Sequence, residues 1–165
     1  PSDGLAQASF QLGPLFVGVL PVIVLGTATV LTAALAATMQ YTRFGRSLRA
    51  AAADVEAAAM TGIDPKAVYA GATALAVGIL GFAAVFQSMR ATVSPADGAF
   101  QLIYAFEAVI IGGMGSIWGA FIGAMVLGIS QSIGFRIDPG FGILAGHLVF
   151  LIILALRPQG ILGKG

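Results

Sequence analysis

Long apolar runs separated by short charged segments dominate this sequence. Leu12–Met39 and Ala67–Met89 contain no charged residue, and about 20 apolar residues suffice for a helix to cross a bilayer. Both runs predict membrane-spanning helices, the first with a kink near Pro21 because proline removes a helical hydrogen bond. Two further apolar runs, Leu102–Gln131 and Phe141–Leu156, complete the pattern. It predicts an all-α polytopic membrane helical bundle.

The third run, of about 30 residues, is too long for one comfortable span. It contains the glycine-rich segment Gly112–Ser116, which predicts a break between a short helix, Leu102–Ile111, and a full one, Ile117–Gly134. The short helix either crosses the bilayer or re-enters it from one side, so the bundle has about four or five crossings. The polar stretches Arg90–Gln101 and Phe135–Gly140 are expected to form loops.

Composition independently indicates a membrane protein. Hydrophobic residues make up 58% of the 165-residue chain and charged residues 9%, whereas soluble domains carry about 25% charged residues. The net charge of +1 gives no support for nucleic-acid binding, and the absence of cysteine excludes disulfides and thiolate metal sites. We expect no metal centre and no nucleic-acid partner.

Tyr41–Lys66 is the one long charged interruption, within what we expect to be a single domain of residues 1–165. Ser47 is suited to cap a short Ala-rich helix, Leu48–Met60, which Gly62 would end. The following pair, Asp64–Pro65, predicts the start of the next span, since it combines an N-cap with proline at the first helical position.

The predicted loop helix carries a narrow apolar stripe. An interfacial helix would bury bulky residues in lipid and carry many cations, whereas this stripe is small and the charges beside it are mixed in sign. We therefore favour docking into a groove of another protein. The stripe consists of Leu48, Ala52, Val55 and Ala59, with Arg49 and Glu56 beside it.

Basic residues indicate the orientation, because cytoplasmic loops carry an excess of Lys and Arg. The loop is rich in them, so we place it in the cytoplasm. The tail with Arg157 and Lys164 joins it there if Leu102–Ile111 crosses, and faces the other side if that helix re-enters. The basic residues of the loop are Arg43, Arg46, Arg49 and Lys66.

Three segments resemble one family of transporters. RFGRSLRAAAADVEAAAMTGID resembles the cytoplasmic coupling segment of bacterial ABC importer permeases. AVIIGGMGSIWGAFIGAMVLGI resembles a Gly-Gly-x-Gly-Ser segment with its following helix, and RPQGILG resembles a C-terminal end. In this order they are similar to the permease subunits that import branched-chain amino acids (leucine, isoleucine and valine). Urea and short-chain amide permeases share these segments. The resemblance covers Tyr41–Gly165.

The resemblance implies the C-terminal portion of a multi-pass permease of the bacterial cytoplasmic (inner) membrane, which moves branched-chain amino acids inward. It also implies an ABC ATPase subunit, a second permease subunit and a substrate-binding protein outside. ATP would be bound by the separate ATPase, and this sequence has no G-x-x-x-x-G-K-[ST] phosphate loop. The chain itself would hold no cofactor and no catalytic residue.

In such importers the loop helix sits in a groove of the ATPase, whose closure rocks the spans. The resemblance implies that charged residues of the loop make polar contacts at the groove rim, that alanines permit close approach, and that a glycine sets the angle of the next span. These residues are Arg46, Arg49, Asp54 and Glu56, then Ala57 and Ala58, and finally Gly62.

The third run also holds candidates for a substrate path. Its glycine-rich segment forms either a tight turn or the end of a discontinuous helix that faces a transported group. Glu107 is an intramembrane carboxylate, typical of functional positions, although it lies near enough to the preceding polar loop to reach the headgroups instead. The other candidates are Gly112, Gly113, Gly115 and Ser116.

His147, the single histidine, lies near the middle of the last run and is expected to hydrogen-bond a neighbouring helix. The pairs Gly119/Gly123 and Gly142/Gly146 have GxxxG spacing and predict close helix packing.

A serine protease of the membrane interior is an alternative from another class, with Ser116 and His147 as its dyad. Such enzymes place the serine in a G-x-S-G motif, whereas Ser116 is followed by Ile117. The charged Ala-rich loop would also have no role in a protease. We therefore favour the permease.

Overall fold

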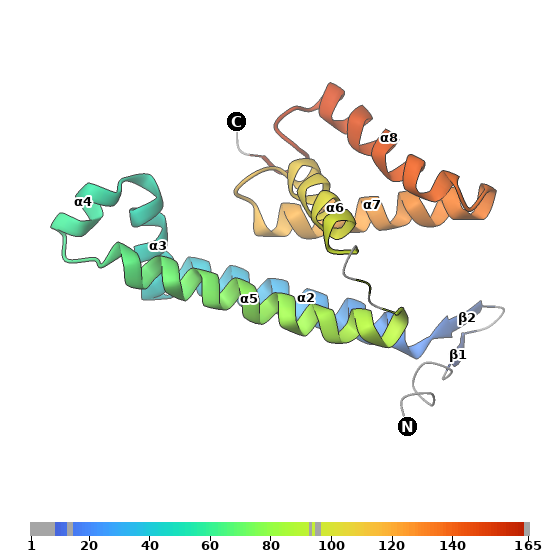
Figure 1. Cartoon of the computed structure of the whole chain (residues 1–165), viewed down its shortest axis with the longest axis horizontal. Helices are drawn as coiled ribbons and strands as arrows, with labels where there is room; N and C mark the ends of the chain where they lie inside the picture. The colour runs from blue at the N-terminus through green and yellow to red at the C-terminus, as the bar shows by residue number, and fades with distance from the viewer. Residues whose placement is uncertain (1–8, 13–14, 93, 95–96, 164–165) are drawn as a thin grey trace. The chain divides into compact units, whose positions relative to one another are not determined.

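The computed structural model describes residues 9–12, 15–92, 94 and 97–163. In this part of the chain a short hairpin is followed by helices α2 to α8 (Figure 1). Contacts divide the chain into two compact units, Pro1–Val93 and Ser94–Gly165. The charged interruption Tyr41–Lys66, called the corner segment below, belongs to the first unit, and the glycine break belongs to the second.

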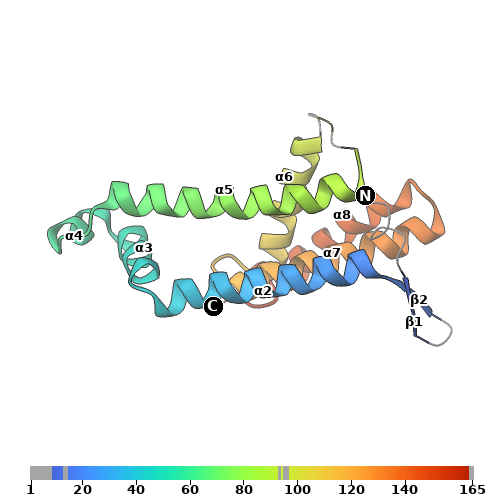
Figure 2. The same ribbon diagram turned by 90° about the horizontal axis from the view of Figure 1, so that it is seen from below.

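The first unit is built on two long helices. α2 (Val19–Tyr41) and α5 (Pro65–Arg90) run side by side in opposite directions in both Figure 1 and Figure 2. Two short helices, α3 (Arg43–Ala53) and α4 (Val55–Met60), connect them at one end. The corner segment thus forms a compact helical turn between two spans.

The first span begins later than the sequence predicts. Strand β1 (Ser9–Leu12) pairs with β2 (Leu15–Gly18) as an antiparallel hairpin that reaches into the uncharged run Leu12–Met39, and α2 starts only at Val19. Pro21 therefore lies in the first helical turn, where N–H groups have no intrahelical acceptor in any case. No helical hydrogen bond is lost there, so the reason for expecting a kink does not hold.

The predicted N-cap of the loop helix is wrong. Thr42, not Ser47, precedes the helix, and its Oγ1 accepts a hydrogen bond from the Gly45 amide at 3.2 Å. Ser47 lies inside α3, half-buried. The hydroxyl of either residue can cap a helix. Thr42 is the cap because the chain turns tightly after α2, so that α3 already begins at Arg43.

The loop helix is also divided in two. Asp54 adopts an extended conformation (φ −155°, ψ 112°), which ends α3 and starts α4. Its carboxylate accepts hydrogen bonds from the amides of Glu56 and Ala57, at 2.9 and 3.0 Å. Aspartate favours caps over helix interiors because its side chain competes for backbone N–H groups. The predicted stripe, which assumed one continuous helix, is therefore not continuous.

The predicted start of the next span is confirmed. The Asp64 carboxylate accepts hydrogen bonds from the amides of Lys66 (2.9 Å) and Ala67 (3.4 Å), and Pro65 opens α5. Gly62 turns the chain between α4 and α5 with φ +86°, a left-handed conformation that favours glycine.

The second unit contains α6 (Asp97–Gly112), α7 (Ile117–Ile137) and α8 (Phe141–Leu156), with α6 and α8 packed against α7 in Figure 1. The predicted glycine break is confirmed. It contains Gly113 and Gly115 with φ of +98° and +91°, values that interrupt a right-handed helix.

Two of these helices extend into the predicted loops. α6 begins at Asp97, so Asp97–Gln101 is helical rather than part of a loop. The Asp97 carboxylate accepts a hydrogen bond from the Ser94 amide at 2.8 Å, and an acidic residue in the first turn is favoured by the helix dipole. α7 continues to Ile137, past the predicted end at Gly134.

Small residues let the helices of the second unit touch. A Cβ atom on Gly119 would lie 2.2 Å from the oxygen of Gly112, and one on Gly123 would lie 2.1 Å from the oxygen of Ala108. Gly142 and Gly146 of α8 likewise face side chains of α7, Phe135 and Gln131 respectively. The predicted packing roles of both glycine pairs are confirmed.

Three helices of the described structure, α2, α5 and α7, are long and apolar enough to cross a membrane, and α8 is apolar but shorter. Their large side chains are widely exposed, with Val30 and Leu80 each 67% accessible. Apolar surface on this scale requires lipid or further protein around it. The predicted all-α membrane bundle is thus confirmed for α2 to α8.

Candidate functional site

The corner segment folds around a small apolar core. Ala51 is fully buried and Ala58 is 4% exposed, and both belong to one cluster with Val68 of α5. Leu48 and Ile63 pack against this cluster. Larger side chains at the two alanines would push the short helices away from α5, because overpacking a tight core strains its neighbours.

Two arginines of α3 bind the C-terminal end of α2. Arg46 Nη1 donates a hydrogen bond to the main-chain oxygen of Tyr41 at 3.2 Å, and Arg49 Nη1 donates one to that of Met39. The last carbonyls of a helix lack intrahelical donors and carry partial negative charge. Both arginines therefore tie α3 to α2, a role that the resemblance did not indicate.

α3 also contacts both long helices closely. A Cβ on Gly45 would lie 2.2 Å from a main-chain oxygen of α2. On the other side, the Phe44 ring covers Gly71 of α5, where a Cβ would lie 2.8 Å from the ring. The Tyr69 hydroxyl of α5 donates a hydrogen bond to the oxygen of Ala51 at 3.0 Å. The corner segment is thus fixed to the ends of two spans.

The outer surface of the corner segment is formed by α4 and its cap. Ala58 faces the core, so its small size serves packing within the corner segment, whereas Ala57 is exposed. Met60 is 83% exposed and Val55 47%. A partner would therefore meet a small, partly apolar surface with acidic groups. Its exposed residues are Asp54, Val55, Glu56, Ala57, Ala59 and Met60.

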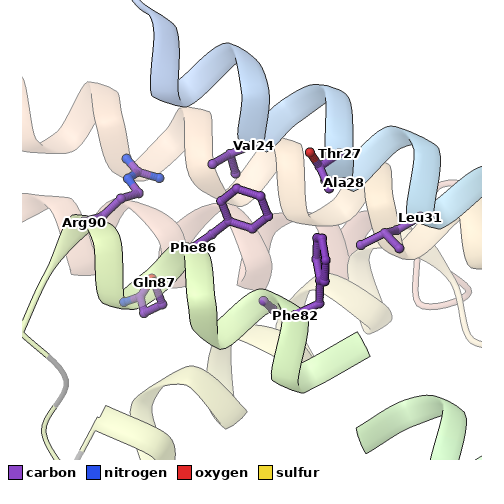
Figure 3. Close-up of a pocket in the computed structure, with 9 residues that line it drawn as sticks. Val24, Thr27, Ala28, Leu31, Phe82, Phe86, Gln87 and Arg90 are labelled. Carbon is purple, nitrogen blue, oxygen red and sulfur yellow. The ribbon is translucent and has the colours of Figure 1, made fainter. Parts of the chain in front are cut away.

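A pocket of about 180 Å³ lies between α2 and α5, in the halves farthest from the corner segment (Figure 3). Figure 3 shows the rings of Phe82 and Phe86 extending from α5 toward α2. Gln87 and Arg90 supply polar groups at one end of a mainly apolar wall. This lining specifies no particular ligand chemistry.

The chain after α8 returns to the glycine break. The amides of Ile161 and Leu162 donate to the last carbonyls of α6, at 2.8 and 3.1 Å. Gly160, with φ +81°, lies so close that a Cβ on it would be 2.4 Å from the nitrogen of Gly113. One side of the break is therefore covered by the main chain of the tail.

The residues predicted for a substrate path fall in different environments. Gly112 and Gly113 are buried, and Gly115 is exposed. Ser116 caps α7, with its Oγ accepting a hydrogen bond from the Gly119 amide at 3.0 Å. The glycine break and Glu107, the carboxylate predicted for the same path, are thus separate features.

Glu107 instead meets the histidine of α8. It is 6% exposed, and its Oε1 is hydrogen-bonded to Nδ1 of His147. The expected hydrogen bond from His147 to a neighbouring helix is therefore confirmed. The Tyr104 ring stacks on the imidazole, with centroids 6.0 Å apart and planes 19° apart. The other oxygen of Glu107, Oε2, is buried without a hydrogen-bond partner in the described structure.

Several of these residues carry no signal in the sequence. Tyr69 and Phe44 resemble any aromatic residue near a membrane boundary, and Gly45 resembles any glycine in a loop. Tyr104 was detectable only as a polar ring in an apolar run, three residues before Glu107, which places both near one side of a helix. Their roles depend on contacts between elements.

A family model described as branched-chain amino acid transport system / permease component matches residues 4–156. The chain is 34% identical over 125 residues to the high-affinity branched-chain amino acid transport system permease protein BraD of Pseudomonas aeruginosa. It is 30% identical over 128 residues to the high-affinity permease protein LivH of Escherichia coli. It is 33% identical over 130 residues to a probable branched-chain amino acid transport permease protein LivH of Methanocaldococcus jannaschii.

The aligned regions cover 74%, 76% and 74% of this chain but only 40%, 42% and 41% of those relatives. The chain therefore spans well under half the length of the relatives it matches. No solved structure matches it.

Proposed function

The chain belongs to the family of branched-chain amino acid transport system permease components, and we propose that it forms part of an ABC importer for these amino acids. It is a multi-pass membrane protein that transports rather than catalyses. ATP is bound and hydrolysed by a separate ATPase subunit. A second permease subunit and a substrate-binding protein complete the importer in the bacterial cytoplasmic membrane.

The corner segment, fixed at both ends, is the observation that carries this proposal. Arg46 and Arg49 hold α3 to the end of α2, and the Tyr69 hydroxyl holds it to α5. A load applied to the corner segment therefore reaches both spans together. Rigid-body movement of spans of this kind is how many transporters alternate access.

The exposed face of α4 supplies the docking surface. Glu56 makes no side-chain hydrogen bond or ion pair in the described structure, so its charge is available to a partner. Ala57 beside it allows close approach, and Met60 adds a flexible apolar contact. Arg46 and Arg49 act here by holding α2, and Asp54 acts by shaping α4.

Cross-linking from single cysteines tests this proposal, because the chain has no cysteine of its own. The variant Ala57→Cys carries a photoactivatable maleimide in the assembled complex. We expect it to cross-link to the ATPase subunit. Ala83→Cys, exposed on α5 away from the corner segment, serves as the control and should give no such product. Equal labelling from both positions, or none from Ala57→Cys, would contradict docking through α4.

A transport assay distinguishes branched-chain amino acids from the alternative substrates, urea and short-chain amides. Vesicles that contain the complex should accumulate radiolabelled L-leucine and exclude radiolabelled urea; the reverse result would assign the alternative substrate. No observation favours the protease. Ser116 caps α7 through its Oγ, and in the described structure no hydrogen bond joins Ser116 to His147.

A further inference from the structure

The polar side chains of α6 lie along one side of the helix. At ~100° per residue, its four polar side chains fall within about a third of the circumference. Phe100 and Ile111 share this third, and the other bulky apolar side chains lie on the remainder. Inside a membrane such a polar side is placed toward protein or water rather than toward lipid. The four residues are Asp97, Gln101, Tyr104 and Glu107.

Glu107, the last of the four along α6, has a carboxylate oxygen to which no group of the described structure donates a hydrogen bond. Glu107 is more than nine-tenths buried and bonds His147 through Oε1, whereas Oε2 has no partner in the described structure. A buried carboxylate oxygen without a donor is costly, so the groups of the described structure compensate the charge of Glu107 only in part.

The histidine is the accessible member of the pair. The side chain of His147 is 40% exposed, against 8% for that of Glu107. Tyr104 stacks on the ring and fixes its orientation. A half-exposed ionisable ring in the middle of a membrane helix faces the bundle interior or a water-filled cavity. Because Nδ1 is bonded to Glu107, Nε2 is the ring nitrogen left for a solute.

The Glu107–His147 pair favours a ligand that is a cation and carries N–H donors. When Nδ1–H donates to the Glu107 carboxylate, the lone pair of His147 lies on the outward nitrogen, Nε2. The pair then carries one negative charge, which an external cation can balance. A metal ion is a poor candidate, because the described residues contain no group of three His, Cys, Asp or Glu side chains able to hold one. An ammonium group fits, since it supplies both charge and donors.

We propose that Tyr104, Glu107 and His147 form a binding site for the ammonium group of an α-amino acid in transit. This site rests on the proposed function and adds to it the part of the substrate that is recognised. The ammonium group donates to Nε2 of His147, Glu107 supplies the balancing charge from behind the ring, and Tyr104 keeps the ring in place. The aliphatic side chain of the substrate makes no contact with this group.

A paired change in protein and ligand tests the site. Equilibrium binding of L-leucine and of 4-methylpentanoate, which lacks the ammonium group, is measured on the permease–ATPase complex without the substrate-binding protein. Glu107→Gln should weaken L-leucine binding by about 10-fold or more, because it removes the negative charge that balances the ammonium group. It should leave binding of 4-methylpentanoate unchanged. Asp97→Asn, which removes the other carboxylate of α6, should alter neither.

If Glu107→Gln weakened the binding of both ligands equally, the Glu107–His147 pair would only tie α6 to α8. That result would overturn the proposed ammonium site. Unchanged L-leucine affinity would overturn it too. These results leave the proposed function intact as long as the unmodified complex accumulates L-leucine. If the unmodified complex neither binds nor accumulates L-leucine, the proposed function itself fails.

A second measurement needs no variant. Diethyl pyrocarbonate modifies neutral, accessible imidazoles, and the product at His147 is quantified by peptide mass spectrometry of the unmodified complex. L-Leucine should protect His147 several-fold, and 4-methylpentanoate should not. Protection by both ligands or by neither would contradict an ammonium contact at this ring.

Discussion

The Tyr69 hydroxyl donates a hydrogen bond to the main-chain oxygen of Ala51 across 3.0 Å, which joins α5 to the last turn of α3. Ala51 has no exposed surface, so the bond lies at the centre of the corner segment. The Phe44 ring over Gly71 forms a second contact between the same helices. Together these contacts fix α3 to a full membrane span, and α4 joins them through Ala58, which belongs to one buried cluster with Ala51 and Val68.

Removing that hydroxyl should weaken coupling without dismantling the protein. Tyr69→Phe keeps the ring but loses one hydrogen bond, a change of about 1 kcal/mol. We expect a normal assembled complex with a lower ratio of L-leucine transported to ATP hydrolysed, measured in proteoliposomes. Tyr41→Phe is the control, because Tyr41 is 78% exposed at the end of α2. An unchanged ratio in Tyr69→Phe, or an equal fall in both variants, would argue against transmission through this bond.

A side chain at position 45 should separate α3 from α2. Gly45→Ala places a methyl group 2.2 Å from the Met39 oxygen, and overpacking of this kind destabilises by about 1–3 kcal/mol. Gly78→Ala is the matched control, because a Cβ there meets no atom within 4 Å. It should be neutral or stabilise by up to ~1 kcal/mol through helix propensity. Thermal unfolding in detergent measures both, and equal transition temperatures would refute the close contact.

Neighbouring alanines on α4 should give different defects when enlarged. Ala58→Trp must fit an indole where the alanine is 4% exposed, so the corner segment should lose its packing and the melting temperature should fall. Ala57→Trp alters an exposed position and should preserve stability while reducing co-purification of the ATPase. Melting curves and pull-downs of both variants test this. If instead Ala57→Trp lowered the melting temperature and Ala58→Trp reduced co-purification, Ala57 would face the core and Ala58 the partner.

The tail should detach from the glycine break when Gly160 is replaced. Gly160→Ala combines a strained φ of +81° with a contact of 2.4 Å to the nitrogen of Gly113. We expect the amides of Ile161 and Leu162 to exchange hydrogen at least about 10-fold faster, because they lose their acceptors on α6. Hydrogen exchange by mass spectrometry reports this. Gly98→Ala, with no atom near its Cβ, should leave the exchange unchanged.

Local chemistry explains why part of the fold was predictable. The Asp64–Pro65 start of α5 and the glycine break before Ser116 depend on groups within a few residues of one another, and both predictions are confirmed. The division at Asp54 is equally local, yet it was missed. The alanines around Asp54 favour one continuous helix, and the capping preference of the aspartate prevailed over them.

The sequence by itself determined which segments span the membrane, where they break and which family the chain resembles, because hydropathy, helix caps and family motifs are properties of neighbouring residues. Only the tertiary structure decided which side chains meet. Glu107 and His147 are 40 residues apart, and Arg49 turns back to α2 rather than outward to a partner. Such pairings depend on how helices cross. The GxxxG spacing predicts that helices pack closely, but it does not say which helix meets which.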